Sequence, residues 1–466
     1  MTPSDTLAAA LPVPTNERRL AMAALMCASI LASLDTTIAN TALPQIAESL
    51  RTSEAAVIWV ANAYQISMIA MLLPFASLGE RVGYKAVFAC GVALFALASA
   101  LCGGASAFWV LILGRALQGI GAAAMSSVAA AVVRHIYPPH MLGRGLGAHA
   151  LVVAIGFTLG PVVASAVLSV ASWHWLFLIN VPLAAPSIAL ALRYLPRGVH
   201  APRPFEPTPA VLCTALLGLL TLGICLLENG NTPNIALSLV AVATVLFFVL
   251  LRLQRGHPAP MLAIDLLAMR SIGFSSLTSI CAFATQSLAL VSLPFLLQST
   301  LGITVVRTGF VLAAWPLVVA VMAAVVSPLS DNGRVSLAVL CSAGLAILAI
   351  GMWALALMPA HVSEAGIALR LALCGVGFGL FQAPNMREIM SSAPAGRSGG
   401  ASGIIAISRL MGQTMGAALV AQCFHTWSAA GPAMALWIGG ATALLGGCFS
   451  ALRLQRFQRV SEVPTA

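Results

Sequence analysis

Two ionisable residues lie in stretches of sequence that are otherwise almost wholly apolar. Asp35 is surrounded mainly by Ala, Leu, Ile and Met, and Arg115 lies in a second apolar stretch. A carboxylate inside a membrane helix is costly, so acids in such positions mark proton or ion pathways. An arginine keeps its proton and must therefore be paired or face water. We expect the two residues to act together in proton coupling, with the protonation of Asp35 following its distance from Arg115.

Each residue also has a purely structural interpretation. Asp35 precedes Thr36 and Thr37, with Asn40 just beyond, so it can be a structural acid whose hydrogen bonds are satisfied locally. Arg115 can donate hydrogen bonds to backbone carbonyls without handling protons. An ordinary aspartate, with a pKa near 3.9, stays ionised at neutral pH. Proton exchange by Asp35 therefore requires a desolvated site.

Long apolar stretches position these residues. A bilayer core about 30 Å thick needs about 20 apolar residues of helix to cross it. The chain is 60% hydrophobic and 8% charged, which is too apolar for a soluble protein of 466 residues. The sequence therefore predicts an all-α integral membrane protein. We place fourteen transmembrane helices at about 20–42, 57–78, 86–104, 107–133, 146–170, 174–195, 209–228, 234–252, 272–298, 306–328, 335–358, 365–386, 403–425 and 431–452.

Basic residues are concentrated in every second one of the short loops that join these helices. The loops after the even-numbered helices, and both ends of the chain, contain most of the arginines, whereas the opposite loops contain little beyond Arg51 and Arg307. The positive-inside rule then predicts that both termini are cytoplasmic. This topology also explains the net charge of +10, so nucleic-acid binding is not needed to account for it.

The sequence also repeats internally. Three pairs of landmarks lie 255, 253 and 251 residues apart: Arg115–Gly121 with Arg370–Gly377, Gly143-Arg144 with Gly396-Arg397, and Leu78–Gly83 with Leu329–Arg334. Parallel six-helix halves are a transporter architecture, so we predict a 6+2+6 arrangement. Its parts are an N-terminal tail (1–19), a six-helix half (20–195), a two-helix insertion with its loops (196–271), a second six-helix half (272–452) and a C-terminal tail (453–466).

Four motifs occur in order along the first half. They are Leu34-Asp35-Thr36 to Leu43-Pro44, the loop from Leu78 to Lys85, Arg115 to Gly121, and Gly156-Phe157-Thr158-Leu159-Gly160-Pro161. Together they resemble the major facilitator superfamily, and within it the fourteen-helix drug:proton antiporters. The run from Trp173 to Pro182 is similar to the same branch. Ala76, Glu80, Tyr84, Ala164, Ser165 and His174 depart from the family pattern without overturning the resemblance.

The resemblance implies roles for two of these motifs. Gly156 and Gly160 form a GxxxG face, and Pro161 removes a backbone hydrogen bond. We expect a bend and a tight seam against the other half, in the element that the family uses to seal the outward end. Ordinary small-residue packing is the alternative. In the cytoplasmic loops, Glu80, Arg81, Gly83, Lys85, Asp331 and Arg334 are candidates for a gate. Exposed ion pairs contribute only about 0–1 kcal/mol each, so these charges can equally serve topology alone.

A substrate cavity in this fold lies near the midplane between the halves. We expect polar and aromatic residues of the spans to line it: Asn40, Tyr64, Gln65, Gln118, Phe157, Gln286, Trp315, Phe378, Gln382 and Asn385. The resemblance implies a multi-pass transporter of the bacterial inner membrane that exports small amphipathic or toxic compounds in exchange for protons. The alternatives are a dedicated transporter of one metabolite and a non-transporting membrane receptor.

Other chemistry finds no support in the sequence. Lys85 is the only lysine and is followed by Ala86, so no phosphate-binding GxxxxGK[ST] loop exists to hydrolyse ATP. The ten cysteines lack CxxC or Cys/His spacing and are interpreted as small buried hydrophobes rather than metal ligands. We therefore expect no enzyme activity, no cofactor and no metal, with the lipid bilayer, protons and a small-molecule substrate as partners. The sequence does not decide whether a periplasmic adaptor binds.

Overall fold

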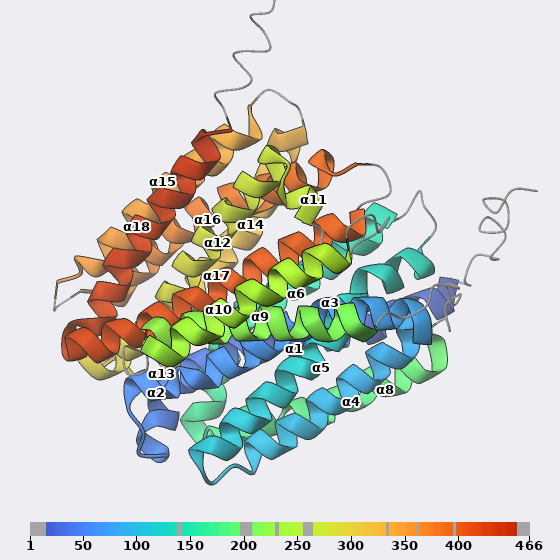
Figure 1. Ribbon diagram of the computed structural model, residues 1–466. Helices are drawn as coiled ribbons and strands as arrows, with labels where there is room; N and C mark the ends of the chain where they lie inside the picture. The colour runs from blue at the N-terminus through green and yellow to red at the C-terminus, as the bar shows by residue number, and fades with distance from the viewer. Residues whose placement is uncertain are drawn as a thin grey trace, which may run out of the picture.

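The computed structural model describes residues 15–137, 142–195, 207–228, 233–254, 264–331, 335–359, 362–394 and 398–453. Within these ranges the chain is helical and contains no β-strand, which confirms the all-α prediction. Figure 1 shows the long helices packed side by side. Their bounds lie within several residues of the predicted ones, because the thickness of a bilayer fixes the length of the apolar segments.

Following the predicted division, we call α1 to α8 the first repeat and α11 to α18 the second. The first contains α1 (Thr15–Ser49), α2 (Glu54–Val57), α3 (Trp59–Val82), α4 (Tyr84–Gly103), α5 (Phe108–Ile136), α6 (Leu142–Val170), α7 (His174–Leu178) and α8 (Asn180–Tyr194). Two helices follow, α9 (Pro207–Glu228) and α10 (Pro233–Leu253). The second repeat comprises α11 (Ile264–Leu267), α12 (Arg270–Phe295) with a π-helical turn η2 (Leu296–Thr300), α13 (Val305–Leu312), α14 (Ala314–Asp331), α15 (Leu337–Ala356), α16 (Glu364–Ser392), α17 (Ser398–Trp427) and α18 (Gly431–Ala451).

Twelve helical segments of the described residues are long and apolar enough to cross a membrane. One of these segments, Gly400–Ala451, contains both α17 and α18. A shorter apolar segment, Ile155–Val170, belongs to α6. The chain is therefore a multi-pass membrane protein.

The internal repeat is visible in helix-to-helix contacts. A methyl group on Gly119 would overlap with the backbone oxygen of Tyr64, and one on Gly375 would lie 2.7 Å from that of Trp315. The next glycine in each motif faces the preceding helix, since methyl groups on Gly121 and Gly377 would lie 2.8 and 2.6 Å from the backbone oxygens of Gly91 in α4 and Gly344 in α15. The glycines at corresponding positions thus allow α5 and α16 to approach corresponding neighbours.

Helices of both repeats meet along a seam. Here α1 packs against α12, α6 against α13 and α14, and α3 against α17. The inserted helix α9 packs against α10, α3 and α17, so it covers one edge of this seam. Figure 1 shows α9 and α10 lying along the bundle between helices of the two repeats.

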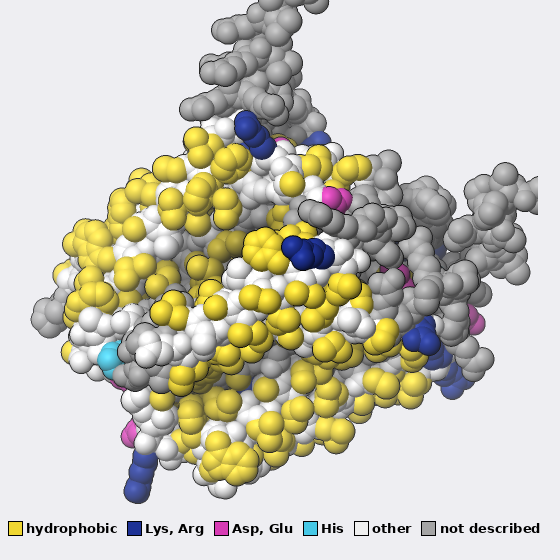
Figure 2. Space-filling view, viewed as in Figure 1, with side chains coloured by type: hydrophobic (Ala, Val, Ile, Leu, Met, Phe, Trp, Pro, Cys, Tyr) yellow, Lys and Arg dark blue, Asp and Glu magenta, His cyan; other side chains and the backbone are white. Residues whose placement is uncertain are grey.

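The two ends of the bundle differ in composition. We call the end where α1 begins and α18 ends the inner end, and the opposite one the outer end. Arg18, Lys85, Arg134, Arg193, Arg252, Arg270 and Arg453 lie near helix termini at the inner end. Every tryptophan except the buried Trp315 lies within about two turns of a helix terminus at the outer end. Figure 2 shows hydrophobic side chains over most of the surface between the ends.

Candidate functional site

The site is built around a buried ion pair between α1 and α5. Nη1 of Arg115 lies 2.5 Å from Oδ2 of Asp35, and each side chain is only 1% exposed. Asp35 lies 14 residues before the end of α1, which is about 21 Å along the helix axis. The structure therefore brings together the two charges that the sequence singled out. Whether they carry protons stays a prediction.

Uncharged side chains complete the hydrogen bonding of the carboxylate. Asn180, the first residue of α8, donates to Oδ1 of Asp35 at 2.8 Å, and Gln118 of α5 donates to the same oxygen at 3.2 Å. Gln118 also donates to the hydroxyl of Ser99 at 2.7 Å and accepts from Arg115 at 2.8 Å. Side chains from α1, α4, α5 and α8 thus form one hydrogen-bond network, in which Arg115, Gln118 and Asn180 donate to the carboxylate of Asp35.

The guanidinium of Arg115 also contacts a backbone oxygen and two aromatic rings. Its Nε donates to the backbone oxygen of Val60 at 2.9 Å. Its Cζ lies 4.4 Å from the ring centroid of Tyr64 and 5.7 Å from that of Phe177. Aromatic faces attract cations within about 6 Å. Arg115 therefore has a backbone carbonyl and two aromatic partners in addition to Asp35.

Asn180 and Ser99 were not among the predicted site residues. Asn180 lies within the Trp173–Pro182 run that resembles the antiporter branch, which is the signal that could have identified it. Ser99 has no such signal, because a single serine in an apolar helix is common and its partner lies 19 residues away in sequence.

The motif Gly156–Pro161 of α6 packs against helices of both repeats. Methyl groups on Gly156 and Gly160 would collide with Ser33 and Thr37 of α1, which belongs to the same repeat. Contact with the other repeat comes from the next turn, where Gly309 of α13 lies against Pro161 and Ser165. The expectation that the two glycines form the seam is therefore corrected. They bring α6 close to the helix that holds Asp35, and Pro161 with Ser165 forms the seam.

The predicted gate residues lie at the inner end. Glu80 and Arg81 are exposed near the end of α3, and Lys85 is half-buried at the start of α4. Gly83 joins these helices with φ of 101°, a value that favours glycine. Asp331 is the last residue of α14, but its side chain and all of Arg334 lie outside the described residues.

The structure places the ten predicted cavity residues in different surroundings, and whether they line a substrate cavity stays a prediction. Tyr64 and Gln118 belong to the ion-pair site, while Gln65 accepts from Thr414 of α17 at 3.3 Å. Phe378 and Trp315 pack in an aromatic cluster within the core of the second repeat. Asn385 donates to Ser279 and accepts from Arg453 near the inner end. Asn40, Phe157 and Gln286 are half-buried, and Gln382 is exposed.

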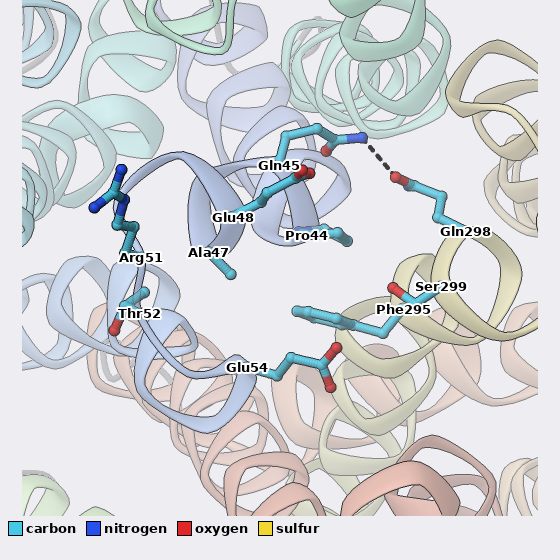
Figure 3. Close-up of a pocket in the computed structure, with 10 residues that line it drawn as sticks. All are labelled: Pro44, Gln45, Ala47, Glu48, Arg51, Thr52, Glu54, Phe295, Gln298 and Ser299. Atoms are coloured by element: carbon cyan, nitrogen blue, oxygen red, sulfur yellow. Dashed lines mark hydrogen bonds between the residues drawn. The ribbon is translucent and has the colours of Figure 1, made fainter.

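A cavity of about 550 Å³ lies at the outer end, between the two repeats. Figure 3 shows the residues that line it, which come from the end of α1, from α2 and its preceding loop, and from the junction of α12 with η2: Pro44, Gln45, Ala47, Glu48, Arg51, Thr52, Glu54, Phe295, Gln298 and Ser299. At one edge, Nε2 of Gln45 donates to Oε1 of Gln298 at 2.6 Å. This hydrogen bond joins the two repeats, and none of the predicted cavity residues is among those that line this space.

A second arginine inside the bundle, Arg409, was not among the predicted site residues. Arg409 lies within α17, and its Nε is buried without a hydrogen-bond partner. The signal was present, because Arg409 falls inside the predicted span 403–425. Among the described residues, no three His, Cys, Asp or Glu side chains lie close enough to hold a metal ion.

Comparison with known proteins gives a family match over most of the chain. The model of the Major Facilitator Superfamily matches residues 25–417. The uncharacterized transporter YebQ of Escherichia coli is 41% identical over 95% of this chain and 97% of its own length. Multidrug resistance protein Stp of Mycobacterium tuberculosis is 30% identical, over 85% of this chain and 74% of its own. Riboflavin transporter RibZ of Clostridioides difficile is 26% identical, over 86% and 87%.

A bundle of apolar helices with an internal repeat, and with a charge pair buried inside it, defines a membrane transporter. The chain belongs to the major facilitator superfamily. Its relatives include multidrug resistance proteins and efflux pumps.

Proposed function

We propose that this protein is a proton-coupled antiporter of the inner membrane that exports small amphipathic compounds by alternating access. The observation that carries the proposal is the buried Asp35–Arg115 pair. Its net charge is zero when Asp35 is ionised and +1 when Asp35 is protonated. Because a net charge inside a membrane is costly, protonation at Asp35 changes which arrangement of the helices is favoured. The proton gradient then supplies the energy without ATP or a cofactor.

The energy is sufficient for useful export. One proton that moves down about 100 mV releases about 2.3 kcal/mol. At about 1.4 kcal/mol per decade, this supports a concentration gradient of about 50-fold.

The proposed topology has fourteen crossings in a 6+2+6 arrangement with both termini in the cytoplasm. In support, α17 and α18 lie in one of the twelve apolar segments but are two helices, and α6 contains a further apolar stretch. The basic residues at the inner end favour a cytoplasmic location for that end. The cavity beside Gln45 would then open toward the periplasm.

Two classes of substrate are compatible with the relatives. Stp is named a multidrug resistance protein, which favours export of varied toxic compounds. RibZ is named a riboflavin transporter, which favours a dedicated transporter of one metabolite as the second candidate. The 41% identical relative bears no substrate in its name and does not decide between them.

Everted vesicles from a bacterium that lacks its own pumps test the proposal. Vesicles that contain the wild-type chain should release protons when members of a toxic-compound panel are added, and cells should resist the same compounds. The Asp35→Asn variant should lose proton release while the protein remains in the membrane. A wild-type rate of proton-coupled export in this variant would contradict the role of Asp35. Absence of resistance and of any pH response to the panel would favour the single-metabolite transporter.

A further inference from the structure

Arg409 is a cation in the middle of the bundle. It is the twelfth of the 30 residues of α17, so about 17 Å of helix separates it from the inner end and about 27 Å from the outer end. Its neighbours Ser408 and Leu410 are buried, while Arg409 itself keeps partial exposure. A guanidinium at this depth is expensive and marks a functional position.

The described residues around Arg409 offer polar groups but no carboxylate. The guanidinium lies close enough to interact electrostatically with Tyr64 of α3 and His149 of α6. Nε2 of His149 lies 2.8 Å from Oγ of Ser29 in α1. On α17 itself, five residues after Arg409, Thr414 donates to Gln65. The Nε of Arg409 is buried and has no hydrogen-bond partner.

Acidic residues are rare inside the described helices. Of the ten acidic residues that these helices contain, only Asp35 lies more than five residues from a helix end. The carboxylate of Asp35 is already held by Arg115, Gln118 and Asn180. Among the described residues, Arg409 is therefore a positive charge deep in the bundle without a carboxylate partner.

The helix that carries Arg409 lies at the seam between the repeats. Methyl groups on Gly412 and Gly416 would overlap with backbone oxygens of α12, so one face of α17 is fixed to its own repeat. Ala406, Ile407 and Met411 pack against the core of the first repeat. Substrates of alternating-access transporters bind near the midplane at the repeat interface, which is where Arg409 lies.

We propose that Arg409 binds the acidic group of the transported compound, so that the substrates of this protein are amphipathic anions such as aromatic carboxylates or sulfonates. This proposal rests on the proposed transport function. The bound anion neutralises Arg409 and accepts the hydrogen bond that its Nε lacks, and a planar guanidinium suits a carboxylate well. Tyr64, which also contacts Arg115, links the anion site to the Asp35–Arg115 pair.

The charge of an anionic substrate determines how strongly the membrane potential drives its export. When one monoanion leaves the cell in exchange for one entering proton, both movements carry positive charge inward. A membrane potential that is negative inside therefore drives the exchange more strongly than it drives the export of a neutral compound. Export of a monovalent cation for one proton moves no net charge.

Two size-matched pairs of probes test the charge preference. One pair is 1-naphthoate and 1-naphthylmethylammonium, and the other is fluorescein and rhodamine 123. Binding to the purified full-length protein is measured for the wild-type chain and for the Arg409→Gln, Arg409→Lys and Arg370→Gln variants, with thermal unfolding as the folding control. The wild-type chain should bind the anion of each pair more tightly. Arg409→Gln should weaken anion binding at least tenfold and leave cation binding unchanged, Arg409→Lys should restore part of it, and Arg370→Gln should bind as the wild type does.

Three results would overturn the proposal: no binding of either anion by the wild-type chain, unchanged anion binding in Arg409→Gln, or equal losses for anions and cations. A failure of the transport proposal looks different. In that case proton release is absent for every compound, while the dependence of anion binding on Arg409 persists.

Discussion

Arg115 and Arg370 lie one residue out of register in the two repeats, four and five residues before the matching glycines, and their side chains meet different partners. Arg115 donates to the carboxylate of Asp35, whereas Arg370 donates to the backbone oxygens of Ala354 and Gly366. The glycines that follow each arginine make corresponding helix contacts. The two repeats therefore have corresponding helix packing but different polar contacts: Arg115 pairs with a carboxylate, whereas Arg370 binds backbone oxygens.

The first prediction compares these two arginines. Arg115→Gln should lower proton-coupled transport at least about tenfold, which corresponds to about 1.4 kcal/mol, because Asp35 loses its cationic partner. Arg370→Gln removes only hydrogen bonds to carbonyls and should retain most of the activity. Transport rates in everted vesicles, normalised to the amount of protein, check both. Equal losses in the two variants would argue that both arginines are merely structural.

The second prediction concerns the stability of the ion pair. Removing one partner of a buried pair costs about 3–5 kcal/mol, because the other charge remains buried. Asp35→Asn and Arg115→Leu should each lower the midpoint of thermal unfolding, and the Asp35→Asn/Arg115→Leu double variant should unfold at a higher temperature than Arg115→Leu. Unfolding of the purified protein in detergent measures this. Additive losses in the double variant would contradict direct coupling of the two side chains.

The third prediction addresses the contact between α6 and α1. A methyl group on Gly160 would overlap with the side chain of Thr37, so Gly160→Ala should destabilise the protein by about 1–3 kcal/mol. Gly218→Ala is the matched control, since the nearest atom to its new methyl group is 3.6 Å away. Adding Thr37→Ala to Gly160→Ala should recover part of the loss. Thermal unfolding distinguishes these variants, and an unaffected Gly160→Ala would refute the close approach.

The fourth prediction tests whether the outer end must open. Gln45 and Gln298 join the two repeats by a hydrogen bond of 2.6 Å. Cysteines at both positions, in a background in which the exposed Cys90 and Cys448 are replaced by Ser, should be linked by a short thiol-reactive cross-linker. Cross-linking should stop transport, and cleavage of the cross-link should restore it.

A control for this cross-link is available within one repeat. Arg307 and Glu364 are exposed, form an ion pair of 2.9 Å and both belong to the second repeat. Cysteines at these two positions can be linked with the same reagent, and transport should continue because α13 and α16 need not separate. Continued transport with the Gln45–Gln298 positions linked would show that the outer end does not separate there.

Much of the fold was predictable because the bilayer limits what the sequence can do. The membrane sets the minimum length of each apolar segment, so the helix containing Arg115 was placed within three residues and the one containing Asp35 within seven. Charges are rare inside such segments, and this rarity singled out the pair. Arg409 carried the same signal and was overlooked.

The partners of the pair could not be predicted as easily. Asn180 lies 145 residues from Asp35 in the sequence, and an uncharged amide is common near helix starts. Likewise, the spacing of Gly156 and Gly160 predicts one small-residue face but not which helix it meets. Only the packing of α6 shows that α1 is this neighbour and that Gly309 meets the following turn. The sequence indicates the reactive groups, while contacts between distant helices decide their surroundings.

Because most tryptophans lie at one end of the bundle, the intrinsic fluorescence of this protein can report on that end. Apart from the buried Trp315, the indole rings lie at the outer end, opposite the arginines. Its intrinsic fluorescence should therefore report from one leaflet. An impermeant quencher such as iodide should dim right-side-out vesicles of the proposed topology more than everted ones, and equal quenching in the two preparations would contradict that topology. Movements of the outer end during transport can then be followed by light emission without attaching a dye.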